Sequence, residues 1–293
     1  MLGFSVYVVN NYGGALFLGT PFAMGVVTAY RYNRVHLSSV ADTMTVVLFS
    51  FVVVAGVLLL SAAEGAICLV MAAPLVLGIG AIGAMMGRDL STRAPLRVRQ
   101  AFIGVLLFPL STSLEALLSP EARALPLREV RSSVVINASP EVVWEQVIAF
   151  PEIPEPSVWV RRSGIAYPIR AEIHGRGVGA VRYCVFSTGP FVEPITDWVP
   201  GRRLAFGVDS QPAPMAEWSP YANVSPPHLD GWMISRRGEF RLVALPGNRT
   251  RLEGSTWYQM RLAPASYWAM FGDGIVHAIH DRVLTHIKHN AEQ

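Results

Sequence analysis

Residues 134–147, "VVINASPEVVWEQV", change near their middle from the residue spacing of a β-strand to that of an α-helix. This change indicates the type of structure in the second half of the chain. The residues that lead up to Ile136 alternate between polar and apolar positions, as a half-buried β-strand does. Ser139 then offers an N-cap, and Pro140 stands at the first helical position, where its missing N–H costs nothing. The stretch therefore predicts a strand that is followed directly by a short helix.

Downstream of this helix, further runs have the composition of antiparallel strands. These runs cover residues 179–188, 191–199, 203–208, 232–245 and 249–262. Pro-Gly-Asn at 246–248 separates the last two runs and is typical of a hairpin turn. The helical pattern of residues 265–291 closes the chain, so this half should consist of strands followed by one long helix.

The first half of the chain has a composition suited to lipid rather than to water. Residues 43–62 contain no charged side chain over twenty positions, the length that crosses the roughly 30 Å hydrocarbon core of a bilayer. Residues 65–87 form a second such run, and Glu64 marks the turn between the two. These runs predict a hairpin of two transmembrane helices.

Two further segments are candidates for membrane spans. Residues 12–30 are apolar but short, and residues 101–118 contain a proline and a glutamate. No basic stretch precedes the first segment, so we do not expect a cleaved signal peptide. With both segments counted, residues 1–120 are predicted to be a membrane region of about four helices, 121–128 a linker and 129–293 a water-soluble domain.

The arginines near the predicted spans indicate an orientation for a multi-pass protein of the inner or plasma membrane. Six arginines lie in the loops that follow the first and third spans, namely Arg31, Arg34, Arg88, Arg93, Arg97 and Arg99. Because cytoplasmic loops are enriched in basic residues, the turn at Glu64 is predicted outside. With four spans the soluble domain is extracytoplasmic, the alternative that the arginine count favours. With three spans it is cytoplasmic, as a smaller group of three arginines around the start of the domain indicates.

The charge pattern speaks against nucleic acid as a partner. The formal net charge is +3, and the basic residues form no dense cluster interleaved with aromatic side chains. Cys68 lies in an apolar run and Cys184 in a strand-like run, so we expect no disulfide between them, and the redox compartment stays open. An oligomeric state does not follow from the sequence.

The closing helical segment carries four of the seven histidines, in two HxxH pairs. At 3.6 residues per turn, one apolar face should pack against the sheet, with Val276, Ile279, Val283 and Ile287 on it. His277 and His280 are candidates for the rim of a pocket, whereas His286 and His289 should be solvated near the helix end. The two pairs face roughly opposite directions, and zinc needs at least three protein ligands, so no metal site is expected.

Two glutamates are expected on strand faces that are otherwise apolar. Glu193 alternates with Phe191 and should share its face. If the turn after residue 245 is a four-residue loop, Glu239 shares a face with Tyr258. A buried carboxylate is costly without a cation or donors nearby, and the candidate partners are Arg182, Arg241 and His280. The alternatives are structural ion pairs, or positions that face solvent because the register is shifted by one residue.

Residues 211–231 form a long proline-rich excursion between two predicted strands. Loops of this length in a compact domain are usually functional or disordered. Trp218 and its aromatic neighbours are too apolar for a merely solvated loop, which predicts a lid over a cavity mouth with His228 at its root. The alternative is that these aromatic side chains lie at the membrane interface, where Trp and Tyr are favoured.

The soluble half resembles the SRPBCC superfamily, which includes START-like and polyketide cyclase/dehydrase-like proteins. The opening phrase at 134–147 carries this resemblance, and "GRGVGAVRYCVFSTGPFVEPIT", "SPPHLDGW", "GEFRLVALPGNRTRLEGSTWYQ" and "IHDRVLTHIKHNAE" are similar to a bacterial branch whose domain follows membrane spans. The resemblance implies an α+β helix-grip fold, in which a curved antiparallel sheet wraps around the final helix with an apolar cavity between them. It implies no catalytic residue set.

The leading hypothesis is a membrane-anchored module that binds a hydrophobic or amphipathic small molecule, such as a lipid, without a cofactor. The expected ligand-binding residues are Arg182, Glu193, Trp218, His228, Glu239, Tyr258, His277 and His280. One alternative is a cyclase- or dehydratase-like enzyme that uses glutamate and histidine side chains for acid–base chemistry. Another is a non-catalytic membrane protein whose soluble domain binds other proteins.

Overall fold

The computed structural model of the chain describes residues 15–92, 125–221 and 229–293, which divide into two compact units. The first unit, the helical unit, takes in the described residues up to 92 together with residues 217–221 and 262–264. The second unit, the β-domain, comprises residues 125–216, 229–261 and 265–293.

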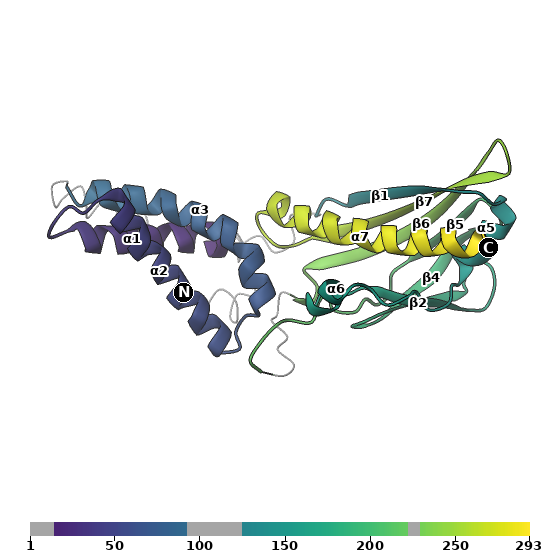
Figure 1. Ribbon diagram of the computed structural model, residues 1–293, viewed down its shortest axis with the longest axis horizontal. Helices are drawn as coiled ribbons and strands as arrows, with labels where there is room; N and C mark the ends of the chain where they lie inside the picture. Colours follow the sequence, from purple (N-terminus) through teal and green to yellow (C-terminus); the bar gives the residue numbers. More distant parts are fainter. Residues whose placement is uncertain (1–14, 93–124, 222–228) are drawn as a thin grey trace. The chain divides into compact units, whose positions relative to one another are not determined.

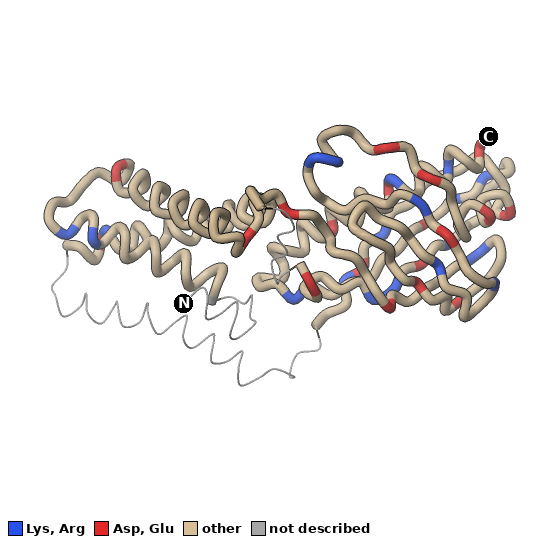
Figure 2. The backbone as a smooth tube through the Cα atoms, turned by 90° about the horizontal axis from the view of Figure 1, so that it is seen from below, with Lys and Arg blue, Asp and Glu red and all other residues tan. Residues whose placement is uncertain are grey.

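The helical unit contains the two central apolar runs as long helices. A π-helical turn, Ala15–Gly19, leads into α1 (Thr20–Asn33), and α2 (Val40–Leu60) and α3 (Ala66–Leu90) follow. Among the described residues, α2 and α3 are long and apolar enough to cross a membrane, and their large apolar side chains point mostly outward. Figure 2 shows how few charged residues these helices carry compared with the β-domain. The segment 101–118 lies outside the described residues.

Helices α1 and α3 approach each other closely at glycines. A Cβ atom added at Gly83 would lie 2.2 Å from the carbonyl oxygen of Phe22, and one at Gly87 would lie 2.2 Å from that of Val26. Gly83 and Gly87 are four residues apart and therefore lie on one side of α3. Small residues with this spacing are typical of helix pairs in lipid, where close backbone contact takes over from the hydrophobic effect.

The turn between α2 and α3 is bound by residues 217–221 of the predicted lid loop. The carbonyl oxygen of Trp218 accepts a hydrogen bond of 2.8 Å from the Ala66 N–H, and the Glu217 carboxylate accepts one of 3.2 Å from the Ile67 N–H. The Tyr221 hydroxyl donates to the Leu60 carbonyl at 2.7 Å. The first two bonds satisfy N–H groups that the first turn of α3 would otherwise leave unpaired, and the third satisfies a carbonyl at the C-terminal end of α2.

The β-domain is built on one antiparallel sheet of seven strands in the order β1-β7-β6-β5-β4-β3-β2. Its strands are β1 (Arg128–Ile136), β2 (Pro168–His174), β3 (Val181–Phe186), β4 (Gly189–Val199), β5 (Arg203–Gly207), β6 (Met233–Leu245) and β7 (Arg249–Met260). The short helices α5 (Pro140–Ile148) and α6 (Val158–Arg162) lie between β1 and β2 in the chain. The strand β2 and the helix α6 were not predicted. The turn between β2 and β3 contains Gly175, Gly177 and Gly179, all at positive φ.

The long helix α7 (Ala265–Ala291) runs along the concave side of this sheet, as Figure 1 shows. Val276, Val283 and Ile287 of its predicted apolar face are buried, and Ile279 is partly buried against the same core. The β-domain therefore has the helix-grip architecture: a curled antiparallel sheet that closes around a C-terminal helix.

The hairpin that joins β6 and β7 is one residue shorter than the four-residue loop considered from the sequence. Leu245 pairs with Arg249, so the connection is residues 246–248, with Gly247 and Asn248 at positive φ. A bulge between Ser235 and Arg237 shifts the register further along the hairpin. Because of the shorter turn, Glu239 pairs with Ser255 rather than with Thr256, and it faces away from the core.

The close contact of α1 with α3 predicts a position-specific response to added volume. We expect Gly83→Leu to destabilise the helical unit by about 1–3 kcal/mol, because the new side chain meets the backbone of α1. Gly78→Leu in the same helix is the matched control, since a Cβ there meets no atom within 4 Å. The measurement is the aggregation temperature of the detergent-solubilised protein, and equal temperatures for both variants would contradict this packing.

Candidate ligand-binding site

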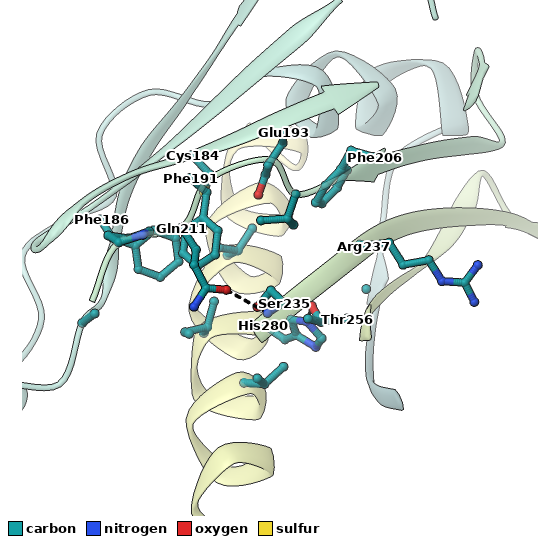
Figure 3. Close-up of a pocket in the computed structure, with 18 of the residues that line it drawn as sticks. Cys184, Phe186, Phe191, Glu193, Phe206, Gln211, Ser235, Arg237, Thr256 and His280 are labelled. Atoms are coloured by element: carbon teal, nitrogen blue, oxygen red, sulfur yellow. Dashed lines mark hydrogen bonds between the residues drawn. The ribbon is translucent and has the colours of Figure 1, made fainter. Parts of the chain in front are cut away.

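A partly open cavity of about 120 Å³ lies in the β-domain between the sheet and α7. Its walls are mainly apolar, with aromatic side chains from β3 to β6 on one side and aliphatic ones from α7 on the other (Figure 3). The principal apolar residues are Cys184, Phe186, Phe191, Phe206, Phe240, Val276, Ile279 and Val283. The volume is close to that of an engineered apolar cavity of about 150 Å³ that takes up benzene. The cavity therefore offers room for roughly one ring.

A buried ion pair lies in the wall formed by β3 and β4. Arg182 and Glu193 are cross-strand partners in register, and their side chains are bonded through the guanidinium Nη1 and the carboxylate Oε2. Both side chains are buried, with 2% of Arg182 and 8% of Glu193 exposed. The pair joins the predicted residue Glu193 to the candidate partner Arg182, and Figure 3 shows the Glu193 carboxylate on the cavity side of its strand.

Aromatic rings surround the guanidinium of Arg182. Its Cζ atom lies 5.4 Å from the ring centroid of Phe206, 5.5 Å from that of Phe240 and 5.6 Å from that of Phe150. Such distances allow cation–π attraction, which is stronger in a site shielded from water. In the described part of the chain, however, no atom accepts a hydrogen bond from the buried Arg182 Nε.

Burial governs the protonation of the groups beside this pair. It raises the pKa of the Glu193 carboxyl, and the charge of Arg182 opposes that rise. It also raises the pKa of the Cys184 thiol to about 12. The thiol is therefore protonated at neutral pH and is a poor nucleophile.

A second polar group reaches the cavity from α7. The His280 Nε2 lies 2.8 Å from the Thr256 hydroxyl, and its Nδ1 lies 3.3 Å from the Ser132 hydroxyl. Ser132 in turn lies 2.9 Å from Nδ1 of the exposed His277. Desolvation, followed by the charge of His277, lowers the pKa of His280 to about 4. His280 is therefore neutral at physiological pH, and both of its ring nitrogens are engaged.

The polar edge of the cavity includes residues that the sequence analysis did not single out. The Gln211 amide accepts a bond of 2.8 Å from the Ser235 N–H, drawn in Figure 3, and donates one of 2.7 Å to the Met233 carbonyl. The first part of the predicted lid loop, residues 211–214, thus borders the cavity. In the sequence, only the position of Gln211 at the start of that loop could have indicated its place at the cavity, because a single glutamine forms no recognisable motif.

Tyr258 was predicted to bind a ligand, but it is not among the residues that line this cavity. Its side chain faces α7 as expected, but it lies beneath Gly272, where an added Cβ would come within 2.9 Å of the hydroxyl. The hydroxyl donates to Asp273 at 2.7 Å, and Asp273 is bonded to Arg128. This network ties β1, β7 and α7 together and has a structural role.

Glu239 was predicted to face the cavity. It borders the cavity through its place on β6, but its carboxylate bonds Arg203 at 2.8 Å on the face of the sheet opposite Phe240. The one-residue change in the hairpin register is the cause, because neighbouring residues on a strand point to opposite faces. Figure 3 likewise shows that the side chain of Arg237 points away from the cavity.

Three further predicted positions differ from expectation. Trp218 belongs to the helical unit rather than to the domain that contains the cavity, and His277 is exposed and is not among the residues that line the cavity. His286, predicted to be solvated, is buried against Phe150 with a ring-centroid distance of 5.9 Å. His228 lies outside the described residues. Within residues 15–92, 125–221 and 229–293, no group of three or more His, Cys, Asp or Glu side chains is placed to hold a metal ion.

Comparison with known proteins agrees with this architecture. Residues 128–261 match the family model described as polyketide cyclase/dehydrase and lipid transport. Residues 128–261 accordingly contain a domain of the SRPBCC type, and the arrangement of the sheet and α7 gives it a helix-grip fold. No curated protein matches the chain significantly.

Several solved structures are similar to part of the chain. The Zhui aromatase/cyclase from Streptomyces sp. R1128 is 18% identical, over 57% of this chain and 94% of that one, with a TM-score of 0.32. The Aha1 dimer from Colwellia psychrerythraea is 13% identical, over 56% and 96%, also with a TM-score of 0.32. A Chromobacterium violaceum protein is 15% identical, over 56% and 97%, with a TM-score of 0.37.

The lowered pKa of His280 predicts an acid-sensitive β-domain. The unfolded chain takes up a proton near pH 6.5, whereas folded His280 does so only near pH 4, so the unfolded state binds more protons between these values. The free energy of unfolding should therefore fall by up to about 3 kcal/mol as the pH drops from 6.5 to 4.

Urea unfolding followed by tryptophan fluorescence measures this effect, because six of the seven tryptophans lie in the β-domain and Trp218 belongs to the helical unit. His280→Gln should flatten the pH dependence, whereas His289→Gln, at an exposed position of the same helix, should preserve it. An unchanged pH dependence in His280→Gln would show that other groups cause the acid sensitivity.

Proposed function

We propose that this protein is a membrane-anchored binding module whose SRPBCC-type domain takes up a hydrophobic or amphipathic small molecule. The observation that carries the proposal is the partly open, mainly aromatic cavity between the sheet and α7. Apolar walls with a few well-placed polar groups are the usual composition of small-molecule sites. Arg182, Glu193 and His280 supply those polar groups here.

Acid–base catalysis has less support from the same cavity. Glu193 is held in an ion pair, and Glu239 is turned towards Arg203. His280 has both ring nitrogens bonded, and its pKa of about 4 is far below the value that suits a general base at neutral pH. Each described group that was considered for this chemistry is therefore engaged elsewhere, which favours binding.

The outward-facing apolar side chains of α2 and α3 support anchoring in a bilayer. Arg31, Arg34 and Arg88 lie near the ends of α1 and α3 that are remote from the α2–α3 turn, and basic ends favour the cytoplasm. With four membrane spans, as predicted from the sequence, this orientation makes the β-domain extracytoplasmic.

Filling the cavity should abolish uptake of a ring-sized molecule. We expect Ile279→Phe to weaken binding of 1-ethyl-4-fluorobenzene by about ten-fold or more, because overpacking commonly costs over 1 kcal/mol. Ala278→Phe, at the adjacent exposed position of α7, is the matched control. The measurement is ¹⁹F NMR of the probe with the full chain in lipid nanodiscs, corrected with empty nanodiscs. Equal binding by both variants, or no binding by the unchanged protein, contradicts the proposal.

The proposed orientation predicts which engineered thiols react from outside the cell. In a background with Cys68→Ser and Cys184→Ala, a membrane-impermeant maleimide should label Ser61→Cys in the α2–α3 turn and Arg176→Cys in the β2–β3 turn. It should label Val35→Cys, between α1 and α2, only after lysis. These three positions are exposed. Labelling of Ser61→Cys alone in intact cells would place the β-domain in the cytoplasm and overturn the orientation.

A further inference from the structure

We propose that the cavity selects an uncharged ring-bearing ligand whose polar group is a hydrogen-bond acceptor, such as a carbonyl oxygen, and that Arg182 binds this group. The inference rests on the proposed function and specifies the ligand class. Three observations carry it: an unpartnered donor, a neutralised charge and a cavity of limited size.

The donor is the Nε–H of Arg182. The side chain is 2% exposed and borders the cavity, and no described residue accepts a hydrogen bond from its Nε. A buried polar group without a partner is costly, and guanidinium has donors but no acceptor. The group that relieves this cost must therefore present an oxygen or nitrogen lone pair. A purely apolar ligand would leave the donor unsatisfied.

The charge of Arg182 is already balanced by Glu193. A carboxylate or phosphate entering the cavity would add an uncompensated negative charge beside Glu193, and an ammonium group would add a positive charge beside Arg182. Either charge would have to leave water for a wall made largely of phenylalanine rings, which is expensive. The ion pair is therefore compatible with a ligand that carries a dipole and disfavours a ligand that carries a net charge.

The size and lining of the cavity favour an aromatic or alicyclic ring next to the acceptor. The volume of about 120 Å³ accommodates roughly one ring, and Phe206 and Phe240 both line the cavity and contact the guanidinium. A ring packed on these side chains places a substituent oxygen near Arg182. Longer ligands would extend through the open side of the cavity.

Four probes of similar size test this selectivity. They are 4-fluoroacetophenone as the neutral acceptor, 1-ethyl-4-fluorobenzene as the apolar analogue, 4-fluorobenzoate as the anion and 4-fluorobenzylamine as the cation. Their dissociation constants are measured by ¹⁹F NMR with the full chain in nanodiscs at pH 8, with empty nanodiscs as the reference for partitioning. We expect 4-fluoroacetophenone to bind on the order of ten-fold more tightly than the apolar analogue, and both charged probes to bind more weakly than either.

The outcomes separate this inference from the proposed function. Binding of none of the probes beyond the empty-nanodisc reference would contradict both. Equal affinity for 4-fluoroacetophenone and 1-ethyl-4-fluorobenzene would leave the binding cavity in place and overturn the role of Arg182. Tightest binding of 4-fluorobenzoate would also overturn it, because Arg182 would then act as an unbalanced cation.

A paired substitution isolates the residues responsible. Arg182→Met with Glu193→Leu removes both charges together, since either change alone would leave a buried charge unpaired. This double variant should bind the apolar probe as before and lose the preference for 4-fluoroacetophenone. Arg203→Met with Glu239→Leu removes a cross-strand pair on the outer face of the sheet and should keep the preference. If both double variants keep it, another donor in the cavity recognises the ligand.

Discussion

The β-domain depends on how closely one helix can approach the concave side of a strongly curved sheet. Towards its N-terminal end, α7 touches the sheet at Gly272, where there is room only for a hydrogen atom above the Tyr258 hydroxyl. Further along, Leu284 packs on Gly254 of β7. The intervening turns, from Ile275 to Val283, border the cavity. Close contact at both ends thus leaves space in the middle, because a straight helix cannot follow a curved surface throughout.

The side chains that line the cavity determine which ligands it can bind. A buried Arg–Glu pair often stabilises a fold less than apolar side chains of the same volume would. Its presence on a core face therefore suggests a role in function rather than in stability. Here the pair lies among phenylalanine rings and is self-neutral, and no described residue accepts a hydrogen bond from the buried Nε–H of Arg182. That combination suits recognition of a dipole in an apolar molecule. A bilayer dissolves such molecules, so the proposed membrane anchor would give the domain a local supply of ligand.

Most of the architecture could be predicted because it follows from repeating patterns. The twenty uncharged residues before Glu64 and the 3.6-residue spacing on α7 each involve many side chains, so one exception does not hide them. The strand β2 was missed because charged residues interrupt its short sequence, "PIRAEIH", and its neighbour Phe150 closes the edge only through tertiary contact. The resemblance to a known superfamily supplied the curvature of the sheet, which no local pattern encodes.

The candidate site was less predictable because single residues and register decide it. The alternation of one strand placed Glu193 on the apolar face with Arg182 as one of three candidate partners, and the structure pairs these two residues. The predicted face of Glu239 was wrong, because a turn at 246–248 that is one residue shorter reverses the faces of the strand. Trp218 was assigned to a lid on grounds of composition, but composition does not say which surface an apolar loop segment covers. The unpartnered Nε of Arg182 is visible only in three dimensions.

Native mass spectrometry of the full chain, purified gently from its own membrane, tests the central claim most directly. If the cavity is a ligand site, a fraction of the protein should carry one small molecule that is retained when detergent is removed and released when the β-domain is unfolded with acid. Fragmentation should show this molecule to be uncharged, with a ring and a carbonyl-type oxygen. Protein that carries no small molecule and acquires none from added membrane extract would contradict the claim that this cavity binds a ligand.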